Sequence, residues 1–436
     1  MVNEKMRGLG ACRSVIRELF EYGKKRKAEI GAENVFDFSI GNPSVPSPAI
    51  VNETLTRLIA ERDAVSLHGY TSAQGDAGVR RAIADYINAT HNAKADPNLI
   101  YLTVGAAASL TISLSALTEA GDEVILLAPF FPEYRVFVER NGAVAVPVLC
   151  NTKTFQPDLD AIRAAITPKT RAIIVNSPNN PTGAVMTKES IEGLSALLTE
   201  ASKENGQPIY LIADEPYREL VYGDVEVPYL PHFYANTLIC YSFSKSLSLP
   251  GERIGYILVN PEAEDALSVY QAVCGAGRAL GFVCAPALFQ YMIPAVIGKT
   301  ADISVYDTNR RLLSEALTSY GYEVVKPDGA FYLFVEALEE SATAFCERAK
   351  EYELLLVASD SFGCPGYVRI SYCVTTEQIQ KSLPAFKALA ESYQTEKSKC
   401  PRTIKTTSWQ RRETKSTKSM PKWQSFSSAV CAPPRR

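Results

Sequence analysis

The sequence predicts an α/β fold with a mostly parallel sheet, covered by helices on both faces, and a smaller α+β domain after residue 290. Between residues 99 and 259, apolar runs of five or six residues alternate with helical stretches, which is typical of buried parallel strands joined by helices. Beyond residue 290 this alternation ends, and a long helix is followed by isolated strands. With 436 residues, the chain is long enough for two packed domains.

Hydrophobic periodicity and breaking residues place the individual elements. Ahead of the sheet, helices are expected at 14–27, 48–60 and 75–88, with a short strand at 35–40 that Gly41-Asn42-Pro43 terminates. Strands of the sheet are expected at 99–104, 123–128, 171–176, 209–213, 238–243 and 254–259. Helices between them are expected at 106–118, 134–140 and 188–200. The second region holds a helix at 301–320 and strands near Phe331 and Val368.

Composition argues against several classes of protein. The chain is 46% hydrophobic and 21% charged, as ordinary globular enzymes are, and no apolar run reaches the length of a membrane span. The charged N-terminus shows no secretory signal, and the ten Cys include no Cys-x-x-Cys pair, which indicates reduced thiols in the cytoplasm. The three His are far apart, so no metal site is expected, and the net charge of −3 suggests no nucleic-acid partner.

Residues 394–436 differ in composition from the rest of the chain. They hold eleven Lys and Arg against two Glu, both Trp of the chain and none of its 25 Gly. Such a break predicts a disordered basic tail outside the folded core. A basic tail could bind an acidic surface, but a non-functional extension is the favoured interpretation.

The stretch from Ser242 to Tyr256 carries the chemistry around which the chain is organised. A β-rich run ends in Ser242, Ser244 and Lys245, and Arg253 follows eight residues after the Lys. A Lys at a strand end can form a Schiff base when its pKa is lowered, and hydroxyls with an Arg suit a phosphate dianion. Together these residues predict a pocket for pyridoxal phosphate, with Lys245 as the imine partner and Arg253 on the phosphate.

Two other interpretations of this stretch compete with that prediction. Ser242-x-x-Lys245 also matches the nucleophile motif of penicillin-binding enzymes, but the accompanying Ser-Asp-Asn and Lys-Thr-Gly tripeptides do not occur in the chain. A solvated loop with ordinary Ser and Lys is the other alternative, and the remaining motifs weigh against it.

Other strand ends carry polar or small residues, at the edge where open α/β sheets bind ligands. The segment 105–109 opens a helix with small side chains, so backbone N–H groups can approach a phosphate. Asp214 could pair with a protonated pyridine nitrogen, and Tyr217 could reach the ring oxygen of the cofactor. Asn180 offers an amide donor within a turn, and Phe131 could stack on a planar ring. Taken singly, these residues also fit a helix N-cap, plain turn chemistry or core packing.

Three motifs occur together in one order and spacing: Asn180-Pro181-Thr182-Gly183, Asp214-x-x-Tyr217, and Ser242-x-Ser244-Lys245 followed by Arg253. The combination resembles the class I and II aminotransferases of pyridoxal-phosphate fold type I, over about residues 5–393, and above all their aspartate-aminotransferase-like members. The resemblance implies a large domain with a mostly parallel seven-stranded sheet and a smaller α+β domain. The implied domains are 1–45 (N-terminal part of the small domain), 46–285 (large cofactor-binding domain), 286–393 (C-terminal small domain) and 394–436 (tail).

The resemblance also implies a role for each matching residue. Lys245 would hold the cofactor as an imine and move the proton between the substrate Cα and the cofactor, while Asp214 would pair with the pyridine nitrogen. Asn180 and Tyr217 would hydrogen-bond the ring oxygen, and Phe131 would stack on the ring. The implied phosphate cradle consists of the N–H groups of Ala106 and Ala107 and the side chains of Ser242, Ser244 and Arg253.

Substrate binding is implied for a further group of residues. Arg369 would bind the α-carboxylate as a bidentate fork beside the backbone of Gly41, although a surface strand position is the alternative for this Arg. Tyr70 would reach the phosphate of a neighbouring subunit, which makes a homodimer necessary for an intact site. Some dicarboxylate-specific relatives carry a Lys where this chain has Ala107, so Arg278 is the candidate for a distal carboxylate, across the dimer interface.

The implied function is transfer of an amino group from an L-amino acid, aspartate-like in preference to aromatic, to the 2-oxo acid 2-oxoglutarate. A β-lyase acting on cystathionine-like substrates could use the same pocket, because the cofactor stabilises the carbanion whatever its fate. A transcription regulator built on this fold is disfavoured, because only about forty residues precede Gly41, too few for a DNA-binding domain.

Overall fold

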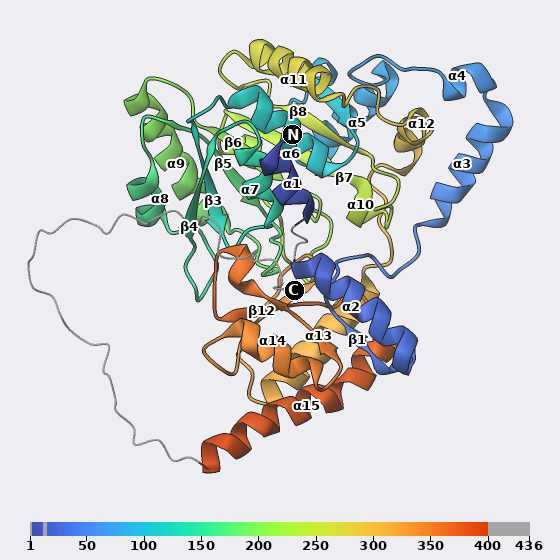
Figure 1. The fold of residues 1–436 in the computed structure, drawn as a ribbon. Coiled ribbons are helices and arrows are strands. Elements are labelled where there is room, and N and C mark those ends of the chain that lie inside the picture. Colours follow the sequence, from blue (N-terminus) through green and yellow to red (C-terminus); the bar gives the residue numbers. More distant parts are fainter. Residues whose placement is uncertain (1, 12–14, 400–436) are drawn as a thin grey trace, which may run out of the picture.

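The computed structural model describes residues 2–11 and 15–399. Its largest element is a seven-stranded sheet with helices on both faces, in the upper part of Figure 1, and a group of shorter strands and helices lies below it. The predicted α/β class and the mostly parallel seven-stranded sheet are confirmed.

The strands of this sheet are β2 (Ile100–Thr103), β3 (Glu123–Ala128), β4 (Val144–Leu149), β5 (Thr170–Asn176), β6 (Tyr210–Asp214), β7 (Thr237–Ser242) and β8 (Gly255–Val259). Their spatial order is β2-β8-β7-β6-β5-β3-β4, with β8 antiparallel to both its neighbours and all other pairs parallel. Asn176 pairs with Asp214, and Asp214 pairs with Cys240. The carboxyl ends of three central strands therefore meet at one edge of the sheet.

Alternate strand residues pack on opposite faces of the sheet, as the two-residue period of a strand requires. One face packs against α6 (Ala106–Leu117), α7 (Glu133–Glu139) and α11 (Ala266–Leu280). The other packs against α5 (Ala77–His91), α8 (Leu159–Ala165), α9 (Lys188–Asn205) and α12 (Ala287–Val296), and α3 (Ala49–Glu61) lies against α12. The strand interiors are consequently buried on both sides, which explains their continuous apolar runs.

The smaller region is built on short strands that are far apart in the sequence. β9 (Tyr332–Glu336), β11 (Val357–Ala358) and β12 (Tyr367–Ser371) form an antiparallel sheet, and β1 (Phe36–Asp37) pairs in parallel with β10 (Leu354–Leu355). The helices of this region are α2 (Val15–Ile30), α13 (Ser304–Ser319), α14 (Ala342–Lys350) and α15 (Thr376–Lys399). Short helices elsewhere are α1 (Glu4–Ala11), α4 (Ala64–His68) and α10 (Phe243–Ser246).

Two strand predictions differ from the structure. No strand was expected at β4, whose apolar run contains Pro147, a residue that is unfavourable in a central strand. In the structure β4 pairs only with β3, so it is an edge strand, where a residue without an N–H group is tolerated. The strand expected at 35–40 is reduced to Phe36–Asp37.

The C-terminal boundary also differs. Helix α15 continues to Lys399, so residues 394–399 are helical and do not start a disordered tail. No Gly or Pro occurs between Pro384 and Pro401 to end the helix earlier. The rest of the predicted tail, 400–436, lies outside the described residues, and the domain boundaries remain a proposal. In the parts of the chain that are described, no helix has the length and apolar character needed to cross a membrane.

Candidate active site

A cavity of about 290 Å³ opens where the carboxyl ends of β5, β6 and β7 meet, and both regions of the chain contribute to its wall. Twelve of the fourteen residues predicted for the site line it: Gly41, Ala106, Ala107, Phe131, Asn180, Asp214, Tyr217, Ser242, Ser244, Lys245, Arg253 and Arg369. The fold thus brings together motifs that are more than three hundred residues apart along the chain.

Lys245 lies in α10, directly after β7, and its side chain points across the cavity. Its Nζ donates a hydrogen bond to the carbonyl oxygen of Gly41 at 2.7 Å. Burial lowers the pKa of Lys245 to about 8, with smaller contributions from the positive charges of Arg253 and Arg369 and an opposing one from Cys373. A larger fraction of this amine is therefore neutral near pH 7 than of an ordinary Lys, which suits a nucleophile and a base.

Asp214 ends β6 and is buried at the floor of the cavity. One carboxylate oxygen, Oδ2, accepts a hydrogen bond from the hydroxyl of Tyr134, while Oδ1 is buried without a partner among the described residues. Burial raises the pKa of Asp214 to about 7, and the Tyr134 bond opposes that rise. A buried carboxylate oxygen with no partner fits a protonated ring nitrogen, which would supply both a donor and a positive charge.

The other end of the cavity suits a phosphate. Gly105 has φ of +87°, and a Cβ there would come 2.7 Å from a guanidinium nitrogen of Arg253, so the backbone and this cation lie close together. The hydroxyls of Ser242 and Ser244 are 2.7 Å apart, and Arg253 Nη1 is 3.4 Å from the Ser244 oxygen. Hydroxyls, one guanidinium and the N-terminus of α6 are the groups that bind a phosphate dianion.

Arg369, on β12, is almost completely buried and faces the same cavity. Its guanidinium donates to Asn180 Oδ1 at 3.1 Å and to the carbonyl oxygen of Ser39, and its Nε has no hydrogen-bond partner in the described chain. A buried guanidinium with donor capacity left over is suited to a carboxylate ligand. The alternative of a surface Arg is wrong, because the side chain is 2% exposed.

Some lining or supporting residues were not predicted from the sequence, notably Tyr134, Asn176 and Tyr332. Asn176 links two strand ends, because its amide donates to the Asp214 carbonyl at 2.8 Å and its Oδ1 accepts from the Asn180 N–H at 2.7 Å. Asn176 ends β5, so the same strand-end reasoning that singled out Asp214 could have found it. Tyr134 and Tyr332 carry no such signal, because their roles depend on packing between distant elements.

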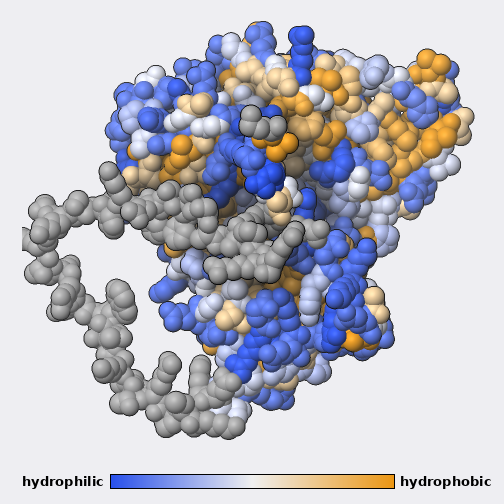
Figure 2. All heavy atoms as spheres, viewed as in Figure 1, coloured by the Kyte–Doolittle hydropathy of each residue, from blue (hydrophilic) through white to orange (hydrophobic). Residues whose placement is uncertain are grey.

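Tyr70 and Arg278 do not line the cavity of their own chain. Tyr70 is 98% exposed, and Arg278 is exposed in the last turn of α11. Other large apolar side chains are exposed near Tyr70, among them Ile59 and Val65, and Figure 2 shows apolar colour gathered over α3 and α4. Both residues remain predictions for the site of a second subunit.

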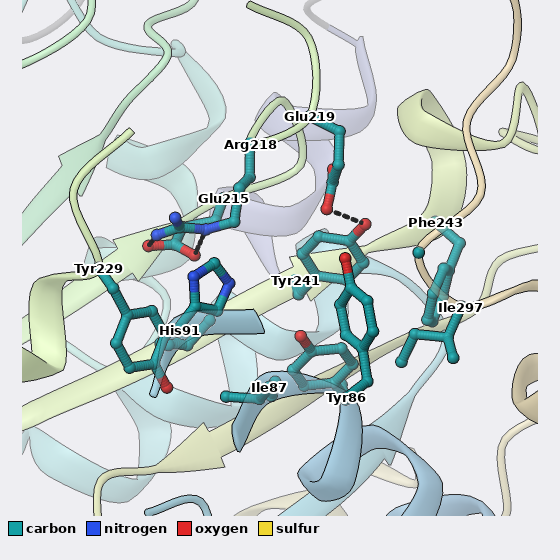
Figure 3. A pocket seen from close by; sticks show the side chains of 13 residues that line it. Tyr86, Ile87, His91, Glu215, Arg218, Glu219, Tyr229, Tyr241, Phe243 and Ile297 are labelled. Carbon is teal, nitrogen blue, oxygen red and sulfur yellow. Dashed lines mark hydrogen bonds and ion pairs between the residues drawn. The ribbon is translucent and has the colours of Figure 1, made fainter. Parts of the chain in front are cut away.

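A second, smaller cavity is lined by other residues of the segment that follows β6, among them Glu215, Arg218 and Glu219 (Figure 3). Arg218 forms two hydrogen bonds of 2.7 Å with Glu215, and both side chains are buried. Glu219 Oε1 accepts from the Tyr241 hydroxyl at 2.9 Å, and that hydroxyl is 3.0 Å from the oxygen of Ser246, next to Lys245. Burial raises the pKa of Glu219 and the positive charge of Arg218 opposes that rise, but the carboxylate to which Arg218 donates its hydrogen bonds is that of Glu215.

Glu219→Gln is expected to stabilise the protein above pH 7. Burial raises the folded-state pKa of Glu219 to about 7, above its ordinary value of 4.5, so stability is lost as the pH rises from about 4.5 to about 7. Gln carries no charge, so its gain over the wild type should reach on the order of 2 kcal/mol at pH 8 and vanish near pH 4. Urea unfolding at pH 4 and pH 8 measures this difference in the free energy of unfolding, and Glu226→Gln, at an exposed position, is the control. An equal effect at both pH values would contradict the expectation.

The comparisons with known proteins agree with this geometry. The family described as aminotransferase class I and II matches residues 33–386. The aspartate aminotransferase of Thermotoga maritima is 31% identical over 373 residues, which cover 84% of this chain and 95% of that protein. An aminotransferase structure from Eubacterium rectale is 58% identical with a TM-score of 0.89, covering 90% of this chain and 99% of that one. The Thermus thermophilus aspartate aminotransferase solved with maleate is 28% identical with a TM-score of 0.77, covering 88% and 98%.

Among the residues that the structure describes, no group of three or more His, Cys, Asp or Glu could hold a metal ion. The charged side chains that line the cavity are instead three cations and one carboxylate, namely Lys245, Arg253, Arg369 and Asp214. This donor set fits an organic ligand with a phosphate, a basic ring nitrogen and a carboxylate-bearing substrate beside it.

Proposed function

Because this chain belongs to the class I and II aminotransferases, which depend on pyridoxal phosphate, we propose that it moves an amino group from an aspartate-like L-amino acid to 2-oxoglutarate. The observation that supports this most is the cavity itself, in which the Lys245 amine, an unpartnered Asp214 oxygen and the unpartnered Arg369 Nε face one space. An aspartate-like donor is favoured because the Thermotoga maritima and Thermus thermophilus relatives are aspartate aminotransferases.

When bound, pyridoxal phosphate supplies a carbonyl that accepts the amino group and a ring that takes up electrons. Asp214 would keep the proton on the ring nitrogen, because its unpartnered oxygen is buried and has no other donor in the described chain. Asn180 and Tyr217 would donate to the ring oxygen, and Phe131 would lie against the ring. Ser242, Ser244 and Arg253 would hold the phosphate beside the first N–H groups of α6.

The substrate would be placed by Arg369 and Gly41, and its proton would be moved by Lys245. Arg369 would bind the α-carboxylate, and this binding would orient the substrate so that its Cα–H bond points toward the Lys245 amine. Lys245 would remove that proton from Cα and return it on the cofactor side, because its lowered pKa places it near the operating pH. Burial of the cavity would keep bulk water away from both transfers.

A homodimer is proposed to complete the site. Tyr70 is 98% exposed, beside further exposed apolar side chains on α3 and α4, which is unfavourable for a free surface and suits an interface. In the dimer Tyr70 would reach the phosphate of the partner subunit and Arg278 the distal carboxylate of its substrate.

The proposal is tested by a single turnover with L-aspartate and no oxo acid, followed by visible absorbance. We expect the band of the bound cofactor to convert to that of its amino form, and 2-oxoglutarate to restore it. Conversion by L-tyrosine but not by L-aspartate would replace the donor class with an aromatic one. An unchanged band with L-aspartate, together with pyruvate and ammonia from cystathionine, would assign a β-lyase instead.

Arg278→Ala tests the distal-carboxylate assignment. We expect kcat/KM for L-aspartate to fall about 30-fold and that for L-tyrosine to change less than about threefold, because only the former loses an ion pair. The measurement is steady-state kinetics with both donors. Equal losses for the two donors would show that Arg278 does not bind the distal carboxylate.

A further inference from the structure

Tyr332 is a buried residue of the cavity wall that lies among the residues of the predicted site. It is the first residue of β9 and is 2% exposed, with its side chain on the cavity. Three residues of the predicted site lie around it, namely Gly41, Tyr217 and Arg369. Its two chemical parts, the hydroxyl and the ring, contact different members of that group.

The hydroxyl of Tyr332 lies 3.0 Å from the hydroxyl of Tyr217. A hydroxyl has one proton, so in a pair of tyrosines one donates and the other accepts. When Tyr332 donates to Tyr217, the proton of Tyr217 is left for the ring oxygen of the cofactor. The Tyr332 hydroxyl also fixes the direction of the Tyr217 proton, because it occupies an acceptor position of the Tyr217 oxygen and leaves the proton to point elsewhere.

The ring of Tyr332 lies under the guanidinium of Arg369, whose Cζ is 4.7 Å from the ring centroid. A cation over an aromatic face is attracted by the ring, and the flat contact also fixes the plane of the guanidinium. That plane decides whether two N–H groups reach a carboxylate together.

Tyr332 also requires a glycine at position 41. A Cβ on Gly41 would lie 2.0 Å from the Tyr332 hydroxyl oxygen, far inside van der Waals contact. The Gly41 carbonyl accepts a hydrogen bond from the Lys245 amine, so the Tyr332 hydroxyl is packed against the residue that holds this amine.

We propose that Tyr332 is a positioning residue with two separable tasks in this active site. Its hydroxyl holds Tyr217 toward the ring oxygen of the cofactor, and its ring holds Arg369 in the plane that binds the α-carboxylate. The inference rests on the proposed function, because it takes pyridoxal phosphate and an amino-acid carboxylate as the ligands of the cavity.

Two substitutions separate the tasks. Tyr332→Phe removes the hydroxyl and keeps the ring, whereas Tyr332→Leu removes both. Tyr322→Phe is the matched control, because the Tyr322 hydroxyl also makes one buried hydrogen bond, to the Phe386 carbonyl at 2.9 Å, and does not line the cavity. Tyr322→Phe therefore removes one buried hydrogen bond of a tyrosine hydroxyl, as Tyr332→Phe does, but at a distance from the active site.

The role of the hydroxyl is tested on the cofactor-loaded protein in the absence of substrate. The measurement is the midpoint pH at which the visible band of the bound pyridoxal phosphate changes. We expect Tyr332→Phe to raise this midpoint by about 0.7 units, since a Tyr217 hydroxyl that is no longer held toward the ring oxygen would stabilise its ionised form about fivefold less. The KM for the best donor in the single-turnover panel should stay within about twofold. An unchanged midpoint would overturn the assignment of the hydroxyl.

The role of the ring is tested by measuring the KM for the best amino donor. We expect Tyr332→Leu to raise KM about tenfold above that of Tyr332→Phe, because Arg369 loses the nearer of its two aromatic faces and keeps only Phe362, at 5.2 Å. Equal KM values for Tyr332→Phe and Tyr332→Leu would overturn the assignment of the ring. Equal midpoint shifts in Tyr332→Phe and the control Tyr322→Phe would show that Tyr332 has a structural role alone. A wild-type protein that binds pyridoxal phosphate but does not use L-aspartate leaves the midpoint test intact, whereas one that binds none overturns both proposals.

Discussion

Replacing Lys245 with Ala is expected to lower the rate of transamination by at least about 10⁴-fold, because one side chain both holds the cofactor and moves the proton. The described cavity contains one Lys, whose amine lies 2.7 Å from the Gly41 carbonyl. Its pKa is lowered to about 8 by burial, so the neutral form that attacks a carbonyl is well populated at physiological pH. The two other cations in the lining, Arg253 and Arg369, remain charged and cannot replace it.

The rate of amino-group transfer would be measured in single turnovers with the preferred donor, with the visible spectrum of the bound cofactor recorded in parallel. In Lys245→Ala both the fast transfer and the characteristic band should be lost, while the far-UV signal of the folded chain is kept. Exposed Lys326→Ala should retain all three. A Lys245→Ala protein that keeps the band and more than about one per cent of the rate would show that a different amine serves the reaction.

Motif spacing predicted the residues around the cavity better than it predicted the contacts between them. Asp214 ends β6, and Asn180 and Lys245 lie shortly after the ends of β5 and β7, and parallel strands bring such positions to one edge of the sheet. The prediction therefore needed only the strands and their direction. Arg369 required the family resemblance, because it reaches the cavity from β12 in the smaller region.

What the sequence could not show depends on pairing between distant segments. A strand was expected at 35–40, but its pairing with β10 could not be, because β1 and β10 are two residues long and more than three hundred residues apart. Tyr134 contributes through the hydrogen bond of its hydroxyl to Asp214, and Tyr332 through its contacts with Tyr217 and Arg369, which lie far from it in the sequence. Buried Tyr residues are common in cores, so residue type alone gave no reason to select these two from the chain's 22.

Asp214→Asn is expected to lower the rate of transamination by about 100- to 1000-fold and, in the cofactor-free protein, to raise stability above pH 7. The rate falls because a neutral amide cannot keep the proton on the ring nitrogen, so the ring takes up electrons less readily. Stability rises because burial places a charged carboxylate where its Oδ1 has no partner in the described chain. Asn retains an oxygen that can accept the Tyr134 hydrogen bond.

The pH dependence of the stability gain follows from the pKa of Asp214. Burial raises it to about 7, from an ordinary value of 3.8, so the folded protein holds this proton more tightly than the unfolded chain. The wild type therefore loses more stability than the variant as the pH rises from about 4 to about 7, and the difference between them should be constant above pH 8. Urea unfolding of the cofactor-free proteins between pH 4 and pH 8 measures this, beside single-turnover rates of the loaded enzymes. If Asp214 serves through its charge, the variant should be slower but more stable than the wild type at pH 8. A variant that is slower and also less stable at pH 8 would instead mean that Asp214 is needed for packing.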